Sequence, residues 1–279
     1  MPDKRGVAAL FRNRARLSGL IGLAIALTIS VLVLLAPLIA PHGQAELIGE
    51  VWAPISADAW LGTDNLGRDL LSRLLYGGRI TLLIALAATV LALLIGCALG
   101  FTAAISGGWV DTILARTVDA VMAIPTLIFA LVLLSVLGTS IPVLIGTIAC
   151  LASTRAFRLS RAVAGNIVAL DYFEAARLRG ERMPWLMAYE VLPNALAPLT
   201  AEFGLRLCAN FLFIAALSFL GLGIQPPLAD WGGMVRDNAT AISYGGLAPL
   251  IPAAAIGIFA IAINLVVDWS LSIQAGERH

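Results

Sequence analysis

The sequence predicts an all-α, polytopic membrane protein with six transmembrane helices and a polar loop between the fourth and fifth. Composition is the first observation: the 279 residues are 60% hydrophobic and 13% charged, and mean hydropathy is +0.94. A soluble domain of this length would need more charge to cover its surface. The second observation is a series of apolar runs long enough to cross about 30 Å of hydrocarbon. The third is the concentration of arginine in alternate loops.

The first transmembrane helix is predicted at residues 17–40, after a basic segment at residues 1–16. A cleaved signal peptide is the alternative interpretation. The apolar run is longer than a typical signal-peptide core and long enough to span the bilayer, which favours a signal anchor with a cytoplasmic N-terminus. Residues 41–79 then form an outer loop that ends in an amphipathic helix leading into the second span.

Residues 80–271 are predicted to hold five further spans, followed by a cytoplasmic tail at 272–279. Pro125 lies inside the third span and predicts a kink. The fourth span is the weakest, because its uncharged run ends at Thr154 and arginines follow. A re-entrant or interfacial segment is the alternative there. The five spans are expected at about 80–105, 117–137, from 141 onward, 195–220 and 246–271.

The distribution of basic residues tests the six-span topology. An excess of Lys and Arg is expected on the cytoplasmic side. With the N-terminus inside, the inner face receives many more basic residues than the outer face. The inner residues are Lys4, Arg5, Arg12, Arg14, Arg16, Arg116, Arg155, Arg158, Arg161, Arg177, Arg179, Arg182 and Arg278; the outer ones are Arg68, Arg73, Arg79 and Arg236. This orientation places both termini and the loop at 171–194 in the cytoplasm.

The loop at 171–194, DYFEAARLRGERMPWLMAYEVLPN, is a polar island between apolar segments. It begins with helix-forming residues, and Gly180 can end a short helix in a left-handed conformation. A second short helix is expected around Trp185, stopping at Leu192-Pro193, because Pro193 suits the first turn of the following span. The loop is therefore predicted to form two short helices that are joined by a turn and lie outside the bilayer.

Several classes of function are excluded by what the sequence lacks. Lys4 is the only lysine, so there is no phosphate-binding GxxxxGK[ST] loop. His42 and His279 are the only histidines, and no catalytic triad or zinc site can be assembled from them. The net charge of +1 gives no case for a nucleic-acid partner. We therefore predict no enzyme activity, no catalytic residue, no metal site and no cofactor bound by this chain.

Two charges lie inside the predicted fifth span. Glu202 and Arg206 are four residues apart and so share one helix face. Isolated charges are costly in hydrocarbon, which predicts that the two side chains pair. A structural ion pair is the favoured interpretation, and a gate or substrate contact is the alternative.

The loop at 171–194 resembles the EAA loop of ABC-importer permeases. In that family, this loop is the coupling helix that docks on the ATP-binding subunit. The pattern falls on Glu174, Ala175, Ala176, Gly180, Leu192 and Pro193. One departure is Glu190, where the family often has an apolar residue. An ordinary cytoplasmic loop with helical content is the alternative, and the full spacing favours the resemblance.

Two further stretches resemble the C-type permease of dipeptide, oligopeptide and nickel importers. Before the second span, WLGTDNLGRD combines an Asx-rich turn with an aspartate near a helix start. After the fifth span, SFLGLG is followed by QPP and DWG. The matching residues are Gly62, Thr63, Asp64, Gly67, Arg68, Asp69, Gln225, Pro226, Trp231 and Gly232. Apolar Phe213 and Ile214 stand where many members keep an acidic residue, and the usual ending is only partly present as Val267-Asp268.

The resemblance implies a membrane-spanning, binding-protein-dependent inner-membrane component of an ATP-driven importer. Its implied partners are a second related permease, two ATP-binding subunits that hold ATP and Mg, an extracytoplasmic binding protein and the lipid bilayer. Peptides are the favoured substrate, and nickel or another small solute is the alternative. An ATP-independent secondary transporter or channel is the alternative from another class; the repeated broken-helix features expected of one are not evident in the sequence.

Overall fold

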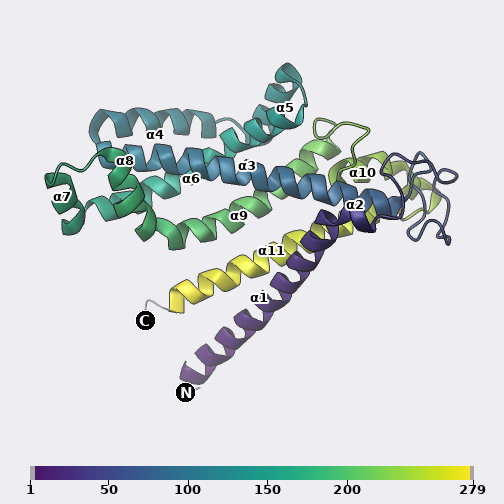
Figure 1. The fold of residues 1–279 in the computed structure, drawn as a ribbon, viewed down its shortest axis with the longest axis horizontal. Helices are drawn as coiled ribbons and strands as arrows, with labels where there is room; N and C mark the ends of the chain where they lie inside the picture. Colours follow the sequence, from purple (N-terminus) through teal and green to yellow (C-terminus); the bar gives the residue numbers. More distant parts are fainter. Residues whose placement is uncertain (1–3, 277–279) are drawn as a thin grey trace. The chain divides into compact units, whose positions relative to one another are not determined.

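A computed structural model describes residues 4–276, with side chains described for residues 16–273. Residues 1–3 and 277–279, including Arg278, and the side chains of Lys4, Arg5, Arg12 and Arg14 lie outside this description. The helical elements (Figure 1) are α1 (Lys4–Leu34), α2 (Ala36–Ile39), α3 (Leu70–Ser106), α4 (Gly108–Met122), α5 (Thr126–Leu137), α6 (Ile141–Val168), α7 (Asp171–Leu178), α8 (Met183–Trp185), the π-helical η1 (Leu186–Val191), α9 (Leu192–Phe219), α10 (Trp231–Asp237), the 3₁₀-helical η2 (Ala239–Tyr244) and α11 (Leu250–Gly276).

The predicted all-α membrane fold is confirmed. None of the described residues forms a β-strand. Within the described chain, five helical stretches are long and apolar enough to cross a membrane. A sixth crossing results when α4 and α5 are counted together as one broken span. The five stretches are Arg16–Leu34, Leu70–Ser106, Ile141–Val168, Met183–Phe219 and Leu250–Ile273.

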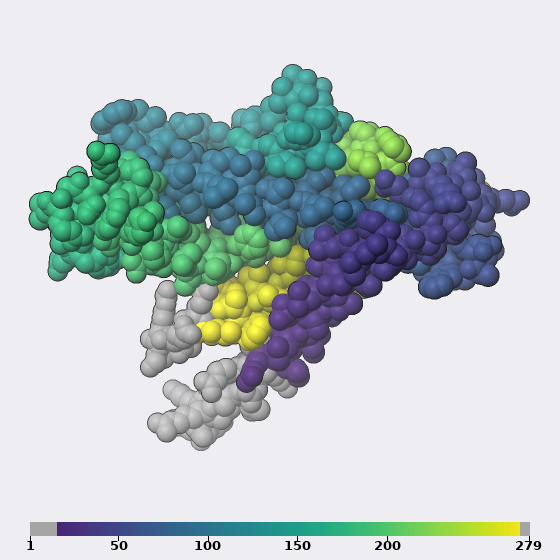
Figure 2. Space-filling view, in the orientation of Figure 1, coloured from purple at the N-terminus to yellow at the C-terminus, as the bar shows by residue number. Residues whose placement is uncertain are grey.

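The described chain divides into two compact units. Unit 1 contains the residues up to Leu86, Gly138–Ile141 and the residues from Leu207 onward; unit 2 contains Ala87–Leu137 and Pro142–Arg206. Helices α3 and α9 each contribute residues to both units. Figure 2 colours the same elements by residue number in space-filling form.

Unit 1 joins α1 to α11 through close backbone approach. A methyl group added at Gly19 would lie 2.3 Å from the side chain of Trp269, so the glycine lets the two helices meet. The same unit holds a folded loop region, which we call the cap: residues 41–69 together with α10. Aromatic side chains pack beneath α10, where Phe211 meets Trp231 edge to face with ring centroids 5.8 Å apart.

Unit 2 is built on close packing between α3 and α6. A methyl group added at Gly96 would lie 2.5 Å from the Ala156 Cβ atom, and one at Gly100 would lie 2.8 Å from the Ser160 Cβ atom. The two glycines of this Gly96-x-x-x-Gly100 pattern thus allow α3 and α6 to approach closely. These contacts hold the α3 segment that faces the 171–194 region.

Three helix boundaries differ from the sequence prediction. The amphipathic helix before the second span is not separate, because α3 runs unbroken from Leu70. The second short helix of the 171–194 loop does not stop at Leu192-Pro193; α8, η1 and α9 form one helical stretch from Met183 to Phe219. The sequence predicts a kink at Pro125, but the helix is interrupted there instead. Helices α4 and α5 are separate, and the bend between them is 87°.

Proline explains the two most conspicuous of these differences. Pro125 supplies no amide donor and disfavours helical geometry in the residue before it, so α4 ends and α5 begins around it. Pro193 lies in the second position of α9, where it leaves an earlier carbonyl without its usual donor. The wider π-helical turn of η1 immediately before it carries the chain past this point without a break.

Candidate functional site

Helix α7 is held to unit 2 by two side chains one turn apart. Phe173 and Ala176 are both 0% exposed. They pack in an apolar cluster with the ends of α3 and α6, which contribute Phe101, Ile105 and Ile167. Their spacing of three residues puts both on one face of the helix. The opposite face of α7 is therefore free.

The exposed face of α7 carries two of the six predicted coupling residues. Glu174 and Ala175 are exposed, and so is Gly180 just after the helix, whereas Ala176 is buried against the unit. Two apolar side chains join them: Tyr172 is 41% exposed and Leu178 is 79% exposed. The exposed face of α7 therefore presents both apolar side chains and a carboxylate. Figure 1 shows α7 at one end of unit 2.

Gly180 ends this surface with a left-handed turn. Its φ angle is +83°, and a methyl group added there would meet no atom within 4 Å. The predicted left-handed conformation is confirmed, and glycine is needed for backbone freedom rather than for space. The Glu181 amide then donates to the Ala176 carbonyl at 3.4 Å, which closes the turn.

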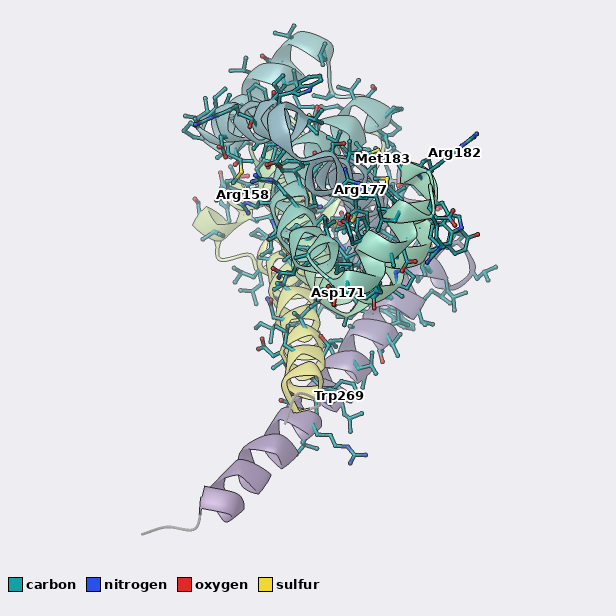
Figure 3. All side chains as sticks on the ribbon, turned by 90° about the vertical axis from the view of Figure 1, so that its left-hand side faces the viewer. Arg158, Asp171, Arg177, Arg182, Met183 and Trp269 are labelled. Carbon is teal, nitrogen blue, oxygen red and sulfur yellow. The ribbon has the colours of Figure 1, made fainter. Side chains whose placement is uncertain are left out.

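The second half of the 171–194 segment leads directly into α9. Leu186 and Val191 are buried in the same apolar cluster as α7. Leu192 and Pro193 are partly to largely exposed, and the Asn194 side-chain amide donates to the Glu190 carbonyl at 2.7 Å. The second half of the segment is therefore continuous with α9. Figure 3 labels Asp171, Arg177, Arg182 and Met183 of this region as it faces the viewer.

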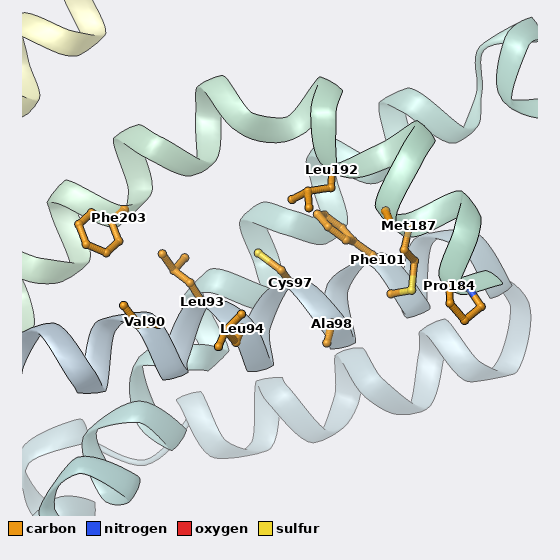
Figure 4. A pocket seen from close by; sticks show the side chains of 11 residues that line it. Val90, Leu93, Leu94, Cys97, Ala98, Phe101, Pro184, Met187, Leu192 and Phe203 are labelled. Atoms are coloured by element: carbon orange, nitrogen blue, oxygen red, sulfur yellow. The ribbon is translucent and has the colours of Figure 1, made fainter.

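An apolar groove of about 470 Å³ separates α3 from the η1–α9 segment. Its walls carry almost no polar atoms (Figure 4). Met187 and Leu192 line one side, and Leu94, Cys97 and Phe101 line the other. The side chains that face each other across the groove are apolar. They attract one another through the hydrophobic effect, which has no preferred direction, rather than through hydrogen bonds.

Ion pairs within the 171–194 segment are long. Arg179 lies 3.9 Å from a Glu181 carboxylate oxygen and 3.8 Å from a Glu190 oxygen. Arg179 is itself more than half exposed, and exposed ion pairs of this kind contribute little to stability. Glu190, the departure from the family pattern, therefore pairs loosely with an arginine of the same segment.

The cap contains most of the remaining predicted motif residues. Asp64 is fully buried and accepts hydrogen bonds from the Leu66 and Arg68 amides at 2.8 and 2.9 Å. Its carboxylate also forms ion pairs with the Arg68 and Arg73 guanidiniums at 2.7 and 3.0 Å. Asp69 accepts from the Ser72 amide at 2.9 Å at the start of α3, where the sequence placed it.

Glycine and threonine residues of the same motif close the cap loops. Gly67 has a φ of +79°, and a methyl group there would lie 2.1 Å from the Gly49 carbonyl oxygen. Thr63 donates to the Glu50 carbonyl at 2.5 Å and accepts from the Ala53 amide at 2.7 Å. Gly62, with a φ of +78°, is buried beside them. These residues build the loop and are not presented at its surface.

The second motif joins α10 to the rest of unit 1. Trp231 is buried and donates to the Leu74 carbonyl at 2.7 Å, while a methyl group at Gly232 would lie 2.2 Å from the Ala215 carbonyl oxygen. Asp230 caps α10 by accepting from the Gly233 amide at 3.0 Å. Burial raises the pKa of the Asp230 carboxyl, and this hydrogen bond opposes the shift. Gln225 and Pro226 are exposed.

The predicted ion pair inside α9 is formed. The Glu202 carboxylate lies 2.8 Å from the Arg206 guanidinium, and both side chains are largely buried in unit 2. Pairing of these two charges matches the expectation from their spacing. Among the described residues, no cluster of His, Cys, Asp and Glu could hold a metal ion.

Sequence reasoning missed several residues that shape these sites. Phe173 anchors α7 and Leu178 projects from it, but neither was singled out from the sequence. Asn238 is buried and accepts from the Trp52 side chain at 3.2 Å and the Asn65 amide at 2.9 Å. Its partners lie more than 170 residues away in sequence, so no local signal identifies it.

Comparison with known proteins gives consistent matches. Residues 92–275 match the family described as binding-protein-dependent transport system inner membrane component. The di/tripeptide transport system permease protein DppC of Pseudomonas aeruginosa is 36% identical, with 96% of this chain and 89% of that protein covered. The dipeptide permease DppC of Haemophilus influenzae is 34% identical (92% and 88% covered). The glutathione permease GsiD of Pectobacterium atrosepticum is 31% identical (76% and 71% covered).

Proposed function

Because the chain belongs to the family of binding-protein-dependent transport system inner membrane components, we propose that it is the permease subunit of an ATP-driven importer of di- or oligopeptides. The observation that carries the substrate class is similarity along almost the whole chain to relatives named for dipeptides or for di- and tripeptides. The family is one of transport permeases, and the chain's single lysine leaves it without a nucleotide-binding loop of its own.

The complete importer would contain four kinds of component. A second related permease would enclose the path together with this chain, and two ATP-binding subunits with their ATP and Mg would dock from the cytoplasm. An extracytoplasmic binding protein would deliver the peptide. Both termini of this chain would lie in the cytoplasm, as the arginine distribution indicates.

The 171–194 segment is the proposed contact with one ATP-binding subunit. Its exposed face offers Glu174, Ala175 and the apolar Leu178 to a partner, while Phe173 and Ala176 fix it to α3 and α6. Closure of the ATP-binding subunits on ATP would push this face. The continuous helix from Met183 to Phe219 would carry the movement into a membrane span and alternate the access of the path.

Charge reversal at the exposed face tests this role. Glu174→Arg reverses the charge of an exposed side chain, and Gly180→Pro removes the left-handed turn. Both variants should reach the membrane at wild-type levels but lose co-purified ATP-binding subunit and substrate-stimulated ATP hydrolysis. Glu50→Arg, the same reversal at an exposed glutamate of the cap, is the matched control and should retain the ATP-binding subunit. Normal coupled uptake in both test variants would refute the role.

A further inference from the structure

A polar pocket lies between three helices of unit 2. Its volume is about 490 Å³, within the range of roughly 300–1,000 Å³ that is typical of small-molecule sites. Unlike the apolar groove beside η1, its wall contains polar and apolar groups in similar shares. The residues that line it come from the end of α3, the start of α4 and the second half of α6, and they include Ala103, Gly107, Asp111, Arg158, Arg161 and Asn166.

One of the two arginines in the pocket already has a partner. The Arg161 Nε and Nη2 groups donate to the two carboxylate oxygens of Asp111, which joins α6 to the first turn of α4. A guanidinium has five N–H donors, so these two hydrogen bonds leave three donors for another acceptor. The Arg161 side chain is 41% exposed, so a ligand in the pocket can reach it.

The other arginine has no acidic partner. Arg158 is exposed, and its Nη1 group lies 4.0 Å from the sulfur atom of Met122, which is a weak acceptor. Among residues 16–273, no carboxylate forms an ion pair with Arg158. The charged residues that line the pocket are Asp111, Arg158 and Arg161, so their charges sum to 2 − 1 = +1. A net positive charge favours an anionic ligand.

The pocket lies where membrane helices end. It includes Asn166, close to the end of α6 at Val168, and Gly107 in the turn between α3 and α4. In the orientation proposed above, these helix ends face the cytoplasm. Beside this turn, Trp109 is 75% exposed, and tryptophan is enriched at the level of lipid headgroups. Arg158 lies roughly 12 Å further into α6 than Asn166, and an exposed arginine inside a span is expected to face water or an anion.

The pocket is separate from the coupling surface. None of the described residues that line it belongs to the 171–194 segment. Figure 3 shows Arg158 on one side of unit 2 and Arg182 of that segment on the other. A protein partner on the exposed face of α7 would therefore leave this pocket open to lipid.

We propose that the pocket binds the phosphate group of an anionic phospholipid, such as phosphatidylglycerol, in the cytoplasmic leaflet. Arg158 and the remaining donors of Arg161 bind the phosphate oxygens, which match the planar donor fork of arginine. Basic pockets between membrane helices on the cytoplasmic side are typical sites for anionic headgroups. Asp111 limits the charge of the pocket to +1, which suits the single negative charge of a phosphodiester. The inference depends on the membrane fold and the proposed orientation, and not on the transported substrate.

The lipid selectivity of the purified full chain tests this site. The chain in detergent is mixed with equal amounts of phosphatidylglycerol and phosphatidylcholine that carry the same acyl chains. Native mass spectrometry then gives the ratio of bound phosphatidylglycerol to bound phosphatidylcholine. Arg158→Gln should lower this ratio about tenfold, the size expected for one lost charge-assisted hydrogen bond. Arg155→Gln, at an exposed arginine of α6 that does not line the pocket, is the matched control and should leave the ratio unchanged.

Two further variants keep the proposal falsifiable if Arg158→Gln folds poorly. Asp111→Asn removes the negative charge and raises the charge of the pocket from +1 to +2, so it should raise the ratio. Gly165 lines the pocket, and a methyl group added there would meet no atom within 4 Å. Gly165→Leu therefore fills part of the pocket without changing its charge and should lower the ratio.

The possible outcomes are distinct. A lower ratio in Arg158→Gln or Gly165→Leu, together with a higher ratio in Asp111→Asn, supports the site. No preference for phosphatidylglycerol in the wild-type chain, or an equal fall of the ratio in Arg155→Gln, overturns it. Displacement of the bound lipid by inorganic phosphate, but not by chloride at the same ionic strength, also overturns it, because the pocket would then bind free anions.

A protein ligand is the remaining outcome. Ratios that stay unchanged in Arg158→Gln and Gly165→Leu overturn the lipid site, and loss of the ATP-binding subunit from the purified importer in the same variants would assign the pocket to a protein contact. The lipid ratio does not depend on transport, so its failure would leave the proposed peptide importer intact. Absence of peptide uptake by the wild-type importer would refute that function without changing the lipid result.

Discussion

The cap and the 171–194 segment are stabilised by opposite means. In the cap, the buried Asp64 carboxylate is held by two amides and two guanidiniums, and Asn238 holds two loops by side-chain hydrogen bonds. In the 171–194 segment, Phe173 and Val191 pack into an apolar cluster, and the ion pairs are 3.8 Å or longer. Directional polar contacts fix one region, and non-directional packing holds the other.

This difference indicates different mechanical roles. A network of buried charges has one favourable geometry, because each displaced group loses a partner that water cannot replace. An apolar contact tolerates sliding, and the groove of about 470 Å³ between α3 and the η1–α9 segment gives room for it. A rigid loop region suits a fixed surface, and a segment that can shift along an apolar wall suits the transmission of movement.

Removing one charge should damage the cap most. Asp64→Asn leaves two buried guanidiniums without their carboxylate, which should destabilise unit 1 by about 3–5 kcal/mol. Thermal unfolding in detergent and proteolysis of residues 41–69 measure the loss. Asp58→Asn, the same change at an exposed aspartate of the cap, is the control and should have no measurable effect. Equal behaviour of the two variants would show that the buried network does not fix the cap.

The 171–194 segment should respond to volume rather than to charge. Ala176 is fully buried and Ala175 is exposed, so Ala176→Leu overfills the cluster while Ala175→Leu does not. Overpacking should cost about 1–3 kcal/mol in the first variant and nothing measurable in the second. Thermal unfolding of the isolated chain separates them. A matched loss of stability in Ala175→Leu would contradict the orientation of α7.

The smallest predicted effect is at the turn after α7. Gly180→Ala forces an alanine into a left-handed conformation and should cost about 1–2 kcal/mol, although the added methyl group meets no atom. Gly165 in α6 also has open space around it but is helical, so Gly165→Ala should be neutral or stabilise by up to about 1 kcal/mol. The hydrogen-exchange rate of the Glu181 amide measures how often the turn opens, and it should rise in Gly180→Ala but not in Gly165→Ala. An unchanged rate in Gly180→Ala would exclude strain at Gly180.

Much of the architecture could be predicted from local sequence signals. Apolar runs predicted the spans, Gly180 predicted the end of α7, and the spacing of Glu202 and Arg206 predicted their pair. Each of these depends on residues adjacent in sequence or on one helix face, which is the information a single sequence carries.

The rest depends on partners that are distant in sequence. Arg73 was counted only as an outer positive charge, yet it pairs with buried Asp64 because the cap loop folds back on α3. The 87° bend between α4 and α5 and the continuity of η1 with α9 follow from how the chain around Pro125 and Pro193 packs. Proline marks a site where a helix must adjust, but the surrounding structure decides between a break and a wider turn.

Site-specific photo-crosslinking tests the proposed coupling surface most directly. A photoreactive residue replaces Leu178 on α7 in one protein and Leu47 in the cap in another; the two positions are 79% and 69% exposed. After irradiation of whole cells, covalent partners are identified by mass. The coupling role predicts an ATP-binding subunit captured at position 178 and not at position 47. The opposite result is an ATP-binding subunit captured at position 47, or captured no more strongly at position 178 than at position 47. Either outcome would contradict the assignment of the 171–194 segment as the coupling surface.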